Sequence, residues 1–417
     1  MKFIVSEPSQ QAPRHRIWRA FGYSLMGVVV LIAIAIGIVQ WTQRHYQATL
    51  QPFYDPPAGW AAKPAGTLLR SEPVELGYVK GRTWRILYVS RNIDHQPTVS
   101  SGLIFAPRSR GSNRDVIGFS HGTLGLGAQC APSRTKNVYQ GAAWLQDMVA
   151  KGWVVAATDY AGLGTSGVSG FLVGQDEAAD VWNSIRAAHQ LPTGAGNQVV
   201  LFGHSQGGHA ALWSASLAGV DGSGYHLRGV VASAPAAELV PLISMQWNQV
   251  AAWAIGPDVI ESWPPTYGVQ AKEVVSAVGN RVTASLIQSC VTKAAIVGII
   301  RQHLGQRYFA ANPAENKSWH RVLVAQSAPQ LPASLPVLIE QGLADDVVLP
   351  ATTEDLIQRE CHGGALLADQ FWPGATHMDV VATATNSIVA WIQSRFMGQS
   401  AVNTCGNPLP SLGVGGS

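Results

Sequence analysis

The sequence predicts an α/β fold, in which helices cover both faces of a mainly parallel β-sheet. In the first half of the chain, short apolar runs rich in β-branched residues alternate with longer stretches of helical pattern, as expected for β-α-β units. At 417 residues, 47% of them hydrophobic, the chain is long enough for one large domain with insertions. The expected strands are residues 85–89, 99–106, 116–119, 154–158 and 228–233, and the expected helices are residues 142–150 and 176–189.

A Gly-x-Ser-x-Gly pattern lies between an apolar run and a helical stretch. The strand-like run 198–202 ends at Gly203, Ser205 follows at the apex, and an Ala/Leu-rich pattern begins after Gly207. This is the strand–turn–helix context of the nucleophile elbow in α/β-hydrolases, where a strained apex residue needs small neighbours. A helix that starts directly behind Ser205 would direct its first N–H groups toward an anion formed there. The sequence therefore predicts an α/β-hydrolase fold with Ser205 as the nucleophile.

A serine nucleophile needs a base, and the base needs an acid to orient it. In α/β-hydrolases these partners follow the serine in the order acid, then histidine, and each comes after a strand. The buried run 336–342 precedes Asp345 and Asp346, and both acids suit this position. The weaker strand 369–373 precedes His377, which is therefore the candidate base.

The oxyanion hole needs two backbone donors, one directly after the nucleophile and one in a loop after an earlier strand. Gln206 supplies the first donor. The second lies in the loop after the strand at 116–119, where Gly122 and Thr123 are both candidates.

The N-terminal region predicts a membrane anchor. Residues 21–39 carry no charge and approach the roughly 20 residues that a spanning helix needs. Four basic residues precede this run and favour a cytoplasmic N-terminus, namely Lys2, Arg14, Arg16 and Arg19. The run ends in a poor cleavage site, so an uncleaved anchor is favoured over a cleaved signal peptide that would give a secreted protein. The expected segments are a cytoplasmic N-terminus at 1–20, a transmembrane signal anchor at 21–41, a Pro-rich stalk at 42–65 and an extracytoplasmic (periplasmic or cell-surface) hydrolase domain at 66–417.

A long segment in the second half of the chain lacks strand patterns. Residues 239–331 instead contain helical, apolar patterns over a length that is too great for a loop in a compact domain. We expect an inserted helical cap over the site. Its apolar residues would form the core of the cap or also line a tunnel for an acyl chain.

Composition indicates which partners the protein could bind and in which compartment its domain folds. A net charge of +3, without a basic stripe interleaved with aromatic residues, argues against nucleic-acid binding. Charged residues make up only 13% of the chain, which suits a protein with a membrane segment and large apolar surfaces. Four cysteines agree with a domain in an oxidising compartment, where three disulfide pairings are open to them. No residue pattern specifies an oligomeric state.

Beyond the elbow, the chain resembles the secretory lipase family from about residue 66 to residue 412. The shared pieces are Gly66-Thr67-Leu68-Leu69, Ser120-His121-Gly122-Thr123, Cys130-Ala131-Pro132-Ser133, residues 158–164, residues 234–239, Asp345-Asp346-Val347-Val348, His377 and Cys405-Gly406-Asn407-Pro408. The resemblance implies that Asp345 is the catalytic acid, and that the disulfides are Cys130–Cys290 and Cys361–Cys405. It also implies hydrolysis of carboxylic esters, often with long acyl chains, and no need for a metal or another cofactor.

The expected protein is thus a membrane-anchored serine ester hydrolase of the lipase type, active on an ester or lipid substrate in lipid catabolism. Ser205, His377 and Asp345 would form its catalytic triad, with Gln206 and either Gly122 or Thr123 as oxyanion donors. The alternatives are an acyltransferase that uses the same acyl-enzyme, a peptidase, and a non-catalytic surface binding module on a hydrolase fold.

Overall fold

The structure is a computed structural model that describes residues 1, 34–35, 37–137 and 139–409. It divides into two units, Met1–Pro52 and Phe53–Ser417. In the first unit, residues 34–35 and 37–52 are helical. Most of the predicted transmembrane segment, residues 21–33 and 36, lies outside the described residues. Among the residues that are described, none of the helices combines the length and the apolar character that crossing a bilayer requires.

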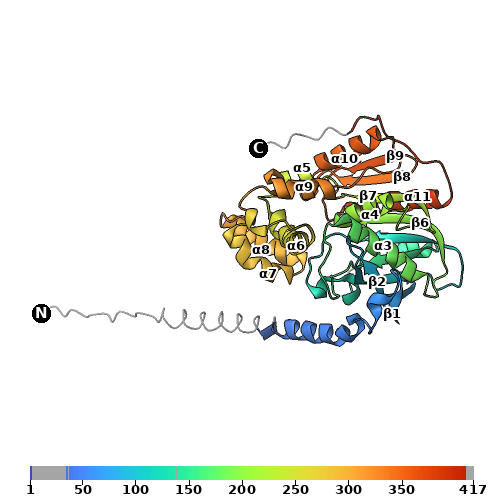
Figure 1. Cartoon of the computed structure of the whole chain (residues 1–417), viewed down its shortest axis with the longest axis horizontal. Coiled ribbons are helices and arrows are strands. Elements are labelled where there is room, and N and C mark those ends of the chain that lie inside the picture. Colours follow the sequence, from blue (N-terminus) through green and yellow to red (C-terminus); the bar gives the residue numbers. More distant parts are fainter. Residues whose placement is uncertain (2–33, 36, 138, 410–417) are drawn as a thin grey trace. The chain divides into compact units, whose positions relative to one another are not determined.

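The second unit contains a nine-stranded sheet (Figure 1). Its spatial order is β1 (Leu68–Pro73), β2 (Arg82–Arg91), β3 (Pro97–Ala106), β5 (Val154–Thr158), β4 (Arg114–Ser120), β6 (Ala195–His204), β7 (His226–Ser233), β8 (Pro336–Gly342) and β9 (Leu366–Trp372). The six strands from β5 to β9 in this order pair in parallel, whereas β1, β2 and β3 form an antiparallel edge. The predicted α/β class is confirmed, and the sheet is mixed rather than parallel throughout.

Helices cover both faces of this sheet, as the alternation of side chains in β6 shows. Val199 and Leu201 pack with α3 and α4 in one apolar core, whereas Val200 and Phe202 pack with α2 and α11 in a second core. Buried strands of parallel sheets carry apolar side chains on both faces in this way. The covering helices are α3 (Gly174–Ala188), α4 (Gln206–Ser216) and α10 (Pro350–His362) on the first face, and α2 (Ala143–Ala150) and α11 (Val380–Phe396) on the second.

Five α-helices are inserted between β7 and β8, at the position expected for the cap. They are α5 (Leu239–Gln246), α6 (Val250–Tyr267), α7 (Ala277–Ile287), α8 (Val291–His303) and α9 (Lys317–Gln326). Their core is a third apolar cluster, in which the rings of Trp263 and Trp319 stack with centroids 6.0 Å apart. The backbone N–H of Ala328 donates to the carbonyl of Ala237 at 2.8 Å. The insertion therefore leaves the hydrolase core and returns to it at one point.

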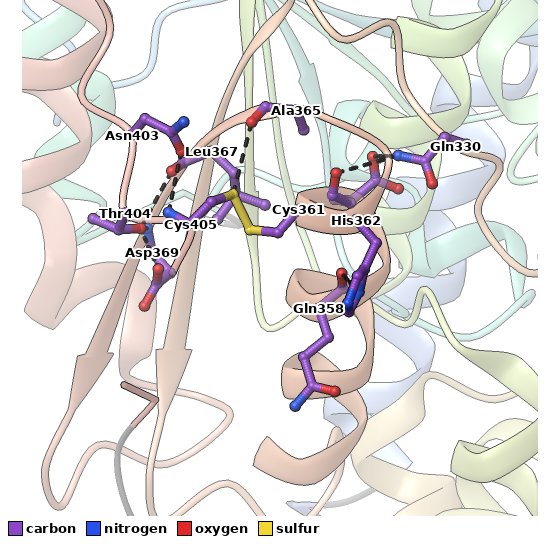
Figure 2. Close-up of a disulfide and its surroundings, with 11 residues drawn as sticks. Gln330, Gln358, Cys361, His362, Ala365, Leu367, Asp369, Asn403, Thr404 and Cys405 are labelled. Carbon is purple, nitrogen blue, oxygen red and sulfur yellow. Dashed lines mark hydrogen bonds between the residues drawn. A yellow bond between two sulfur atoms is a disulfide. The ribbon is translucent and has the colours of Figure 1, made fainter. Parts of the chain in front are cut away.

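Two disulfides connect distant parts of the second unit, and they are the pairs that the family resemblance implied. Cys130–Cys290 joins the loop after β4 to the residue before α8. Cys361–Cys405 joins the last turn of α10 to the C-terminal segment (Figure 2). That segment also pairs with β9, because the backbone N–H of Asp369 donates to Thr404 Oγ1 at 3.0 Å.

Candidate active site

The nucleophile elbow forms where β6 ends and α4 begins. Ser205 has φ 59° and ψ −121°, a strained conformation for a residue with a side chain. The turn is possible because glycines lie two residues before and two residues after Ser205. A Cβ atom on Gly203 would lie 1.8 Å from the carbonyl oxygen of Gly207, and one on Gly207 would lie 1.9 Å from that of Ser120. Both glycines of the motif are thus required by close backbone approach.

The loops after β8 and β9 bring Asp345 and His377 to this elbow. Nε2 of His377 lies 2.9 Å from Oγ of Ser205, and Nδ1 of His377 lies 2.7 Å from Oδ2 of Asp345. All three side chains are buried. The three residues that were predicted from widely separated motifs thus form one continuous hydrogen-bonded chain.

The two neighbouring acids in the loop after β8 have different surroundings. Asp345 is buried, and its Oδ1 accepts hydrogen bonds from the backbone N–H groups of Val347 and Val348, both at 2.9 Å. Its Oδ2 faces His377 and also accepts from Gln341 at 3.3 Å. Asp346 is exposed. The geometry therefore brings Asp345 and not Asp346 to the histidine.

His204 is a site residue for which the sequence predicted no role, although it lies within the elbow motif. Its ring packs against that of His377 with centroids 4.7 Å apart, and its Nε2 lies 2.9 Å from the carbonyl oxygen of His377. Burial, followed by the neighbouring His377, lowers the pKa of His204 to about 3. The ring is therefore neutral near pH 7 and donates from Nε2 to the carbonyl, which helps to fix the backbone of His377.

The predicted oxyanion donors lie beside the serine. A Cβ atom on Gly122 would lie 3.2 Å from Cβ of Ser205, which places this part of the loop after β4 directly against the elbow. Thr123 and Gln206 line the same cavity as Ser205. The hydroxyl of Tyr160 holds the loop by donating to the carbonyl of His121 at 3.0 Å.

Behind Gln206 lies a buried polar cluster that the sequence did not indicate. Oε1 of Glu177 accepts from the Gln206 side chain at 2.9 Å and from the backbone N–H of Leu172 at 3.1 Å. Oε2 of Glu177 lies 2.7 Å from Nδ1 of His209, and the other ring nitrogen of His209 lies 2.7 Å from the carbonyl oxygen of Gln326. Since Gln326 ends α9, the cluster connects the first turn of α4 to the inserted helices.

An apolar cavity extends from Ser205 into the inserted helices. The cavity is narrow, with a volume of about 60 Å³, and part of it is open to solvent. Ser205, Thr123, Gln206 and Gln246 contribute polar groups to its wall, and helices α5, α6 and α9 contribute most of the apolar side chains. The apolar residues include Leu239, Leu242, Ile243, Val259, Trp263 and Leu323. Among the described residues, no group of three or more His, Cys, Asp or Glu side chains is arranged to hold a metal ion.

Comparison with known protein families identifies the chain. The sequence model of the family described as "Secretory lipase" matches residues 129–404, about two thirds of the chain. The chain belongs to the secretory lipase family. The matched region includes the elbow, both loops that carry Asp345 and His377, and all the inserted helices.

Individual relatives of this secretory lipase family member agree with the assignment. A secreted triacylglycerol lipase of Malassezia globosa is 22% identical over 381 residues, which cover 85% of this chain and 79% of the relative. A second secreted triacylglycerol lipase of the same organism is 22% identical over 408 residues, which cover 91% of this chain and 88% of the relative. A probable inactive lipase of Mycobacterium tuberculosis is 26% identical over 207 residues, which cover 45% and 46%. The family and its relatives make the chain a serine ester hydrolase of the lipase and esterase type.

Solved structures share the fold. Lipase A of Candida antarctica in its closed state superimposes with a TM-score of 0.70 at 16% identity, covering 87% of this chain and 89% of that one. A rice cell wall degrading esterase of Xanthomonas oryzae superimposes with a TM-score of 0.66 at 19% identity, covering 81% and 100%. These likenesses establish the α/β-hydrolase fold of this secretory lipase family member.

Proposed function

We propose that this protein hydrolyses lipid esters through Ser205 as nucleophile, His377 as general base and acid, and Asp345 as the orienting carboxylate. The observation that carries the proposal is the hydrogen-bonded chain from Asp345 through His377 to Ser205, at the wall of an apolar cavity. A serine hydroxyl is a weak nucleophile until a positioned base removes its proton, and this arrangement supplies that base.

In the first half of the reaction, Ser205 Oγ forms a bond to the ester carbonyl carbon while its proton moves to Nε2 of His377. The carbonyl oxygen gains the negative charge and accepts hydrogen bonds from the backbone N–H of Gln206 and that of Gly122 or Thr123. Asp345 stabilises the charged imidazole through Nδ1. When the ester C–O bond breaks, His377 gives its proton to the departing alcohol, and the acyl group stays on Ser205.

The second half repeats these steps with water. His377 takes a proton from a water molecule, the resulting nucleophile attacks the acyl carbon, and the same backbone groups bind the oxyanion. His377 then returns the proton to Ser205 Oγ as the acid departs, so that the enzyme is regenerated.

The apolar wall of the cavity supports a substrate with an apolar acyl chain. Its wall is aliphatic and aromatic apart from a few polar groups, such as Gln246, whose side chain amide donates to the backbone carbonyls of Asp346 and Val347. Burial of each methylene group contributes about 0.8 kcal/mol, so lengthening the chain improves binding until the cavity is filled. The secreted triacylglycerol lipases among the relatives agree with this class of substrate.

The test is turnover of p-nitrophenyl esters of increasing chain length, together with labelling by a fluorophosphonate probe. Ser205→Ala should abolish labelling and lower turnover by about 10⁴-fold or more. Ser216→Ala, a change at the end of the same helix, is the matched control and should behave as the parent protein. An unlabelled parent protein would favour the non-catalytic alternative, and a labelled Ser205→Ala variant would refute the nucleophile.

We also propose that residues 21–41 anchor the protein in a membrane, with residues 66–417 on the extracytoplasmic side. The uncharged run and the basic residues before it support this topology, and two disulfides suit an oxidising compartment. The anchored protein should stay in the membrane fraction in carbonate, with its hydrolase domain open to external protease. Mature protein in the medium with a new N-terminus near residues 42–50 would instead establish a cleaved signal peptide and secretion.

A further inference from the structure

Helix α8 carries large aliphatic side chains on a face that no other element covers. Its inner side packs on α6 through small residues, since a Cβ atom on Gly298 would lie 2.7 Å from Cβ of Trp253. On the opposite side, Ile296, Ile299 and Ile300 are 54%, 46% and 57% exposed, and Leu304 beyond the helix end is 68% exposed. Their spacing of three, four and eight residues from Ile296 places them in one stripe. We refer to these four residues as the α8 outer face.

The segment of the chain that contains α8 is basic. Residues 274–314 contain four cationic side chains and no aspartate or glutamate. The cations are Arg281, Lys293, Arg301 and Arg307. Lys293 and Arg301 belong to α8 itself, and an apolar stripe combined with cationic side chains on one helix is typical of helices that lie in the interface of an anionic lipid layer. The positive charge attracts the lipid head groups, and the isoleucines enter the acyl boundary beneath them.

Helix α8 is also fixed to the loop that contains the candidate oxyanion donors. Cys290, the residue before α8, forms the disulfide with Cys130 in that loop. The backbone N–H of Val291 donates to the carbonyl of Leu124 at 2.8 Å. A Cβ atom on Gly125 would lie 2.4 Å from the carbonyl of Ser289, so the two segments are in close contact. Any surface on which α8 docks therefore also fixes the orientation of the loop after β4, which contains the candidate oxyanion donors.

We propose that the α8 outer face docks on an anionic lipid surface. Figure 1 shows α6, α7 and α8 grouped beside the sheet, and the contacts of α6 with α7 and α8 agree with this view. Four exposed aliphatic side chains within nine residues are costly in water, and a lipid layer removes them from it. Docking is a property of this surface alone, and it does not require that Ser205, His377 and Asp345 act as proposed above.

The test places an environment-sensitive fluorophore on the α8 outer face of the full chain. In the structure the four native cysteines are paired in disulfides, so Ile300→Cys introduces a single reactive thiol. The labelled protein is reconstituted in vesicles of phosphatidylcholine with phosphatidylglycerol and in vesicles of phosphatidylcholine alone. Val220→Cys is the matched control, because Val220 is an exposed valine, 71% accessible, outside the inserted helices.

The label at position 300 should shift to the blue and be quenched by lipids that carry a quencher in the acyl chain, most strongly in the anionic vesicles. The label at position 220 should remain in water. Combining Ile296→Ser with Ile299→Ser in the labelled chain should lower the lipid-inserted fraction by about tenfold or more, because two buried isoleucines are lost. Val402→Ser, another exposed valine, should leave it unchanged.

Two outcomes would overturn the proposal. A label at position 300 that stays aqueous in anionic vesicles would show that the face does not meet lipid. A blue shift without lipid that grows with protein concentration would show that the face is a contact between copies of the chain. Both outcomes are measured by fluorescence and not by ester turnover. A failure of docking can therefore be distinguished from a failure of the proposed catalytic residues.

Discussion

Replacement of Asp345 by asparagine should nearly abolish turnover, whereas the same replacement of Asp346 should not. An asparagine at 345 can keep the two bonds from Val347 and Val348 by placing its oxygen where Oδ1 lies. Its NH₂ group would then point at Nδ1 of His377, where the carboxylate now accepts at 2.7 Å. The imidazole can meet that donor only with an unprotonated Nδ1, so its proton moves to Nε2, the atom that must receive the proton of Ser205.

The expected loss is about 10⁴-fold in kcat, equivalent to about 5.5 kcal/mol in the activation free energy. Exposed Asp346 offers a matched control, since a surface substitution of this kind changes stability by about 0.5 kcal/mol or less. The assay is steady-state hydrolysis of p-nitrophenyl butyrate, with the unfolding midpoint in urea as the check on folding. The reasoning is refuted if Asp345→Asn keeps turnover within tenfold of the parent while folded, or if Asp346→Asn shows the larger loss.

Three further perturbations probe the surroundings of the site. Glu177→Ala removes the acceptor for buried His209 and for the Gln206 side chain, so the free energy of unfolding in urea should fall by about 3–5 kcal/mol and turnover should fall with it. A loss below about 1 kcal/mol would show that this cluster contributes little to stability. Removing Cys130–Cys290, which spans 160 residues, should lower the free energy of unfolding by about 5 kcal/mol, and removing Cys361–Cys405, which spans 44, by about 4 kcal/mol, because a longer closed loop restricts the unfolded chain more. Equal losses would contradict this entropic explanation. Burial raises the pKa of Glu340 to about 7, so folding takes up a proton there and stability should fall by about 3 kcal/mol as the pH rises from about 4.5 to about 7. Unfolding curves of Glu340→Gln should lack this component, and an unchanged pH dependence would contradict the assignment.

The sequence predicted those parts of the protein that are specified by local patterns. The elbow depends on a strand, two glycines and a helix start that are contiguous in the chain, so the sequence predicted Ser205 at its apex directly. His377 and the Asp345–Asp346 pair were predicted as its partners because each follows a strand-like run in a fixed order. The choice between the two acids depends on which carboxylate turns toward β9, and spacing along the chain does not contain that information.

The features that were missed depend on tertiary contact or on weak strand signals. Strand β1 lies at an edge, is only half-buried, and contains Arg70, Glu72 and Pro73, which are typical of edge strands and reduce the strand signal. Glu177 lies in α3, and only the packing of α3 against α4 brings it to Gln206. Such a carboxylate has the same local sequence signature as a solvated residue in the first turn of a helix.

The hydrogen bond between Ala328 and Ala237 has a consequence for protein engineering. Because the inserted helices start and finish at neighbouring positions, residues 238–327 form a module that could be exchanged between family members without lengthening or shortening any strand. The graft must nevertheless place a backbone carbonyl where that of Gln326 lies, since the ring of His209 in α4 is hydrogen-bonded to it. Chimeras that keep this acceptor should fold with new chain-length selectivity, and chimeras without it should lose stability even when their cavities are well filled, a contrast that thermal unfolding would measure directly.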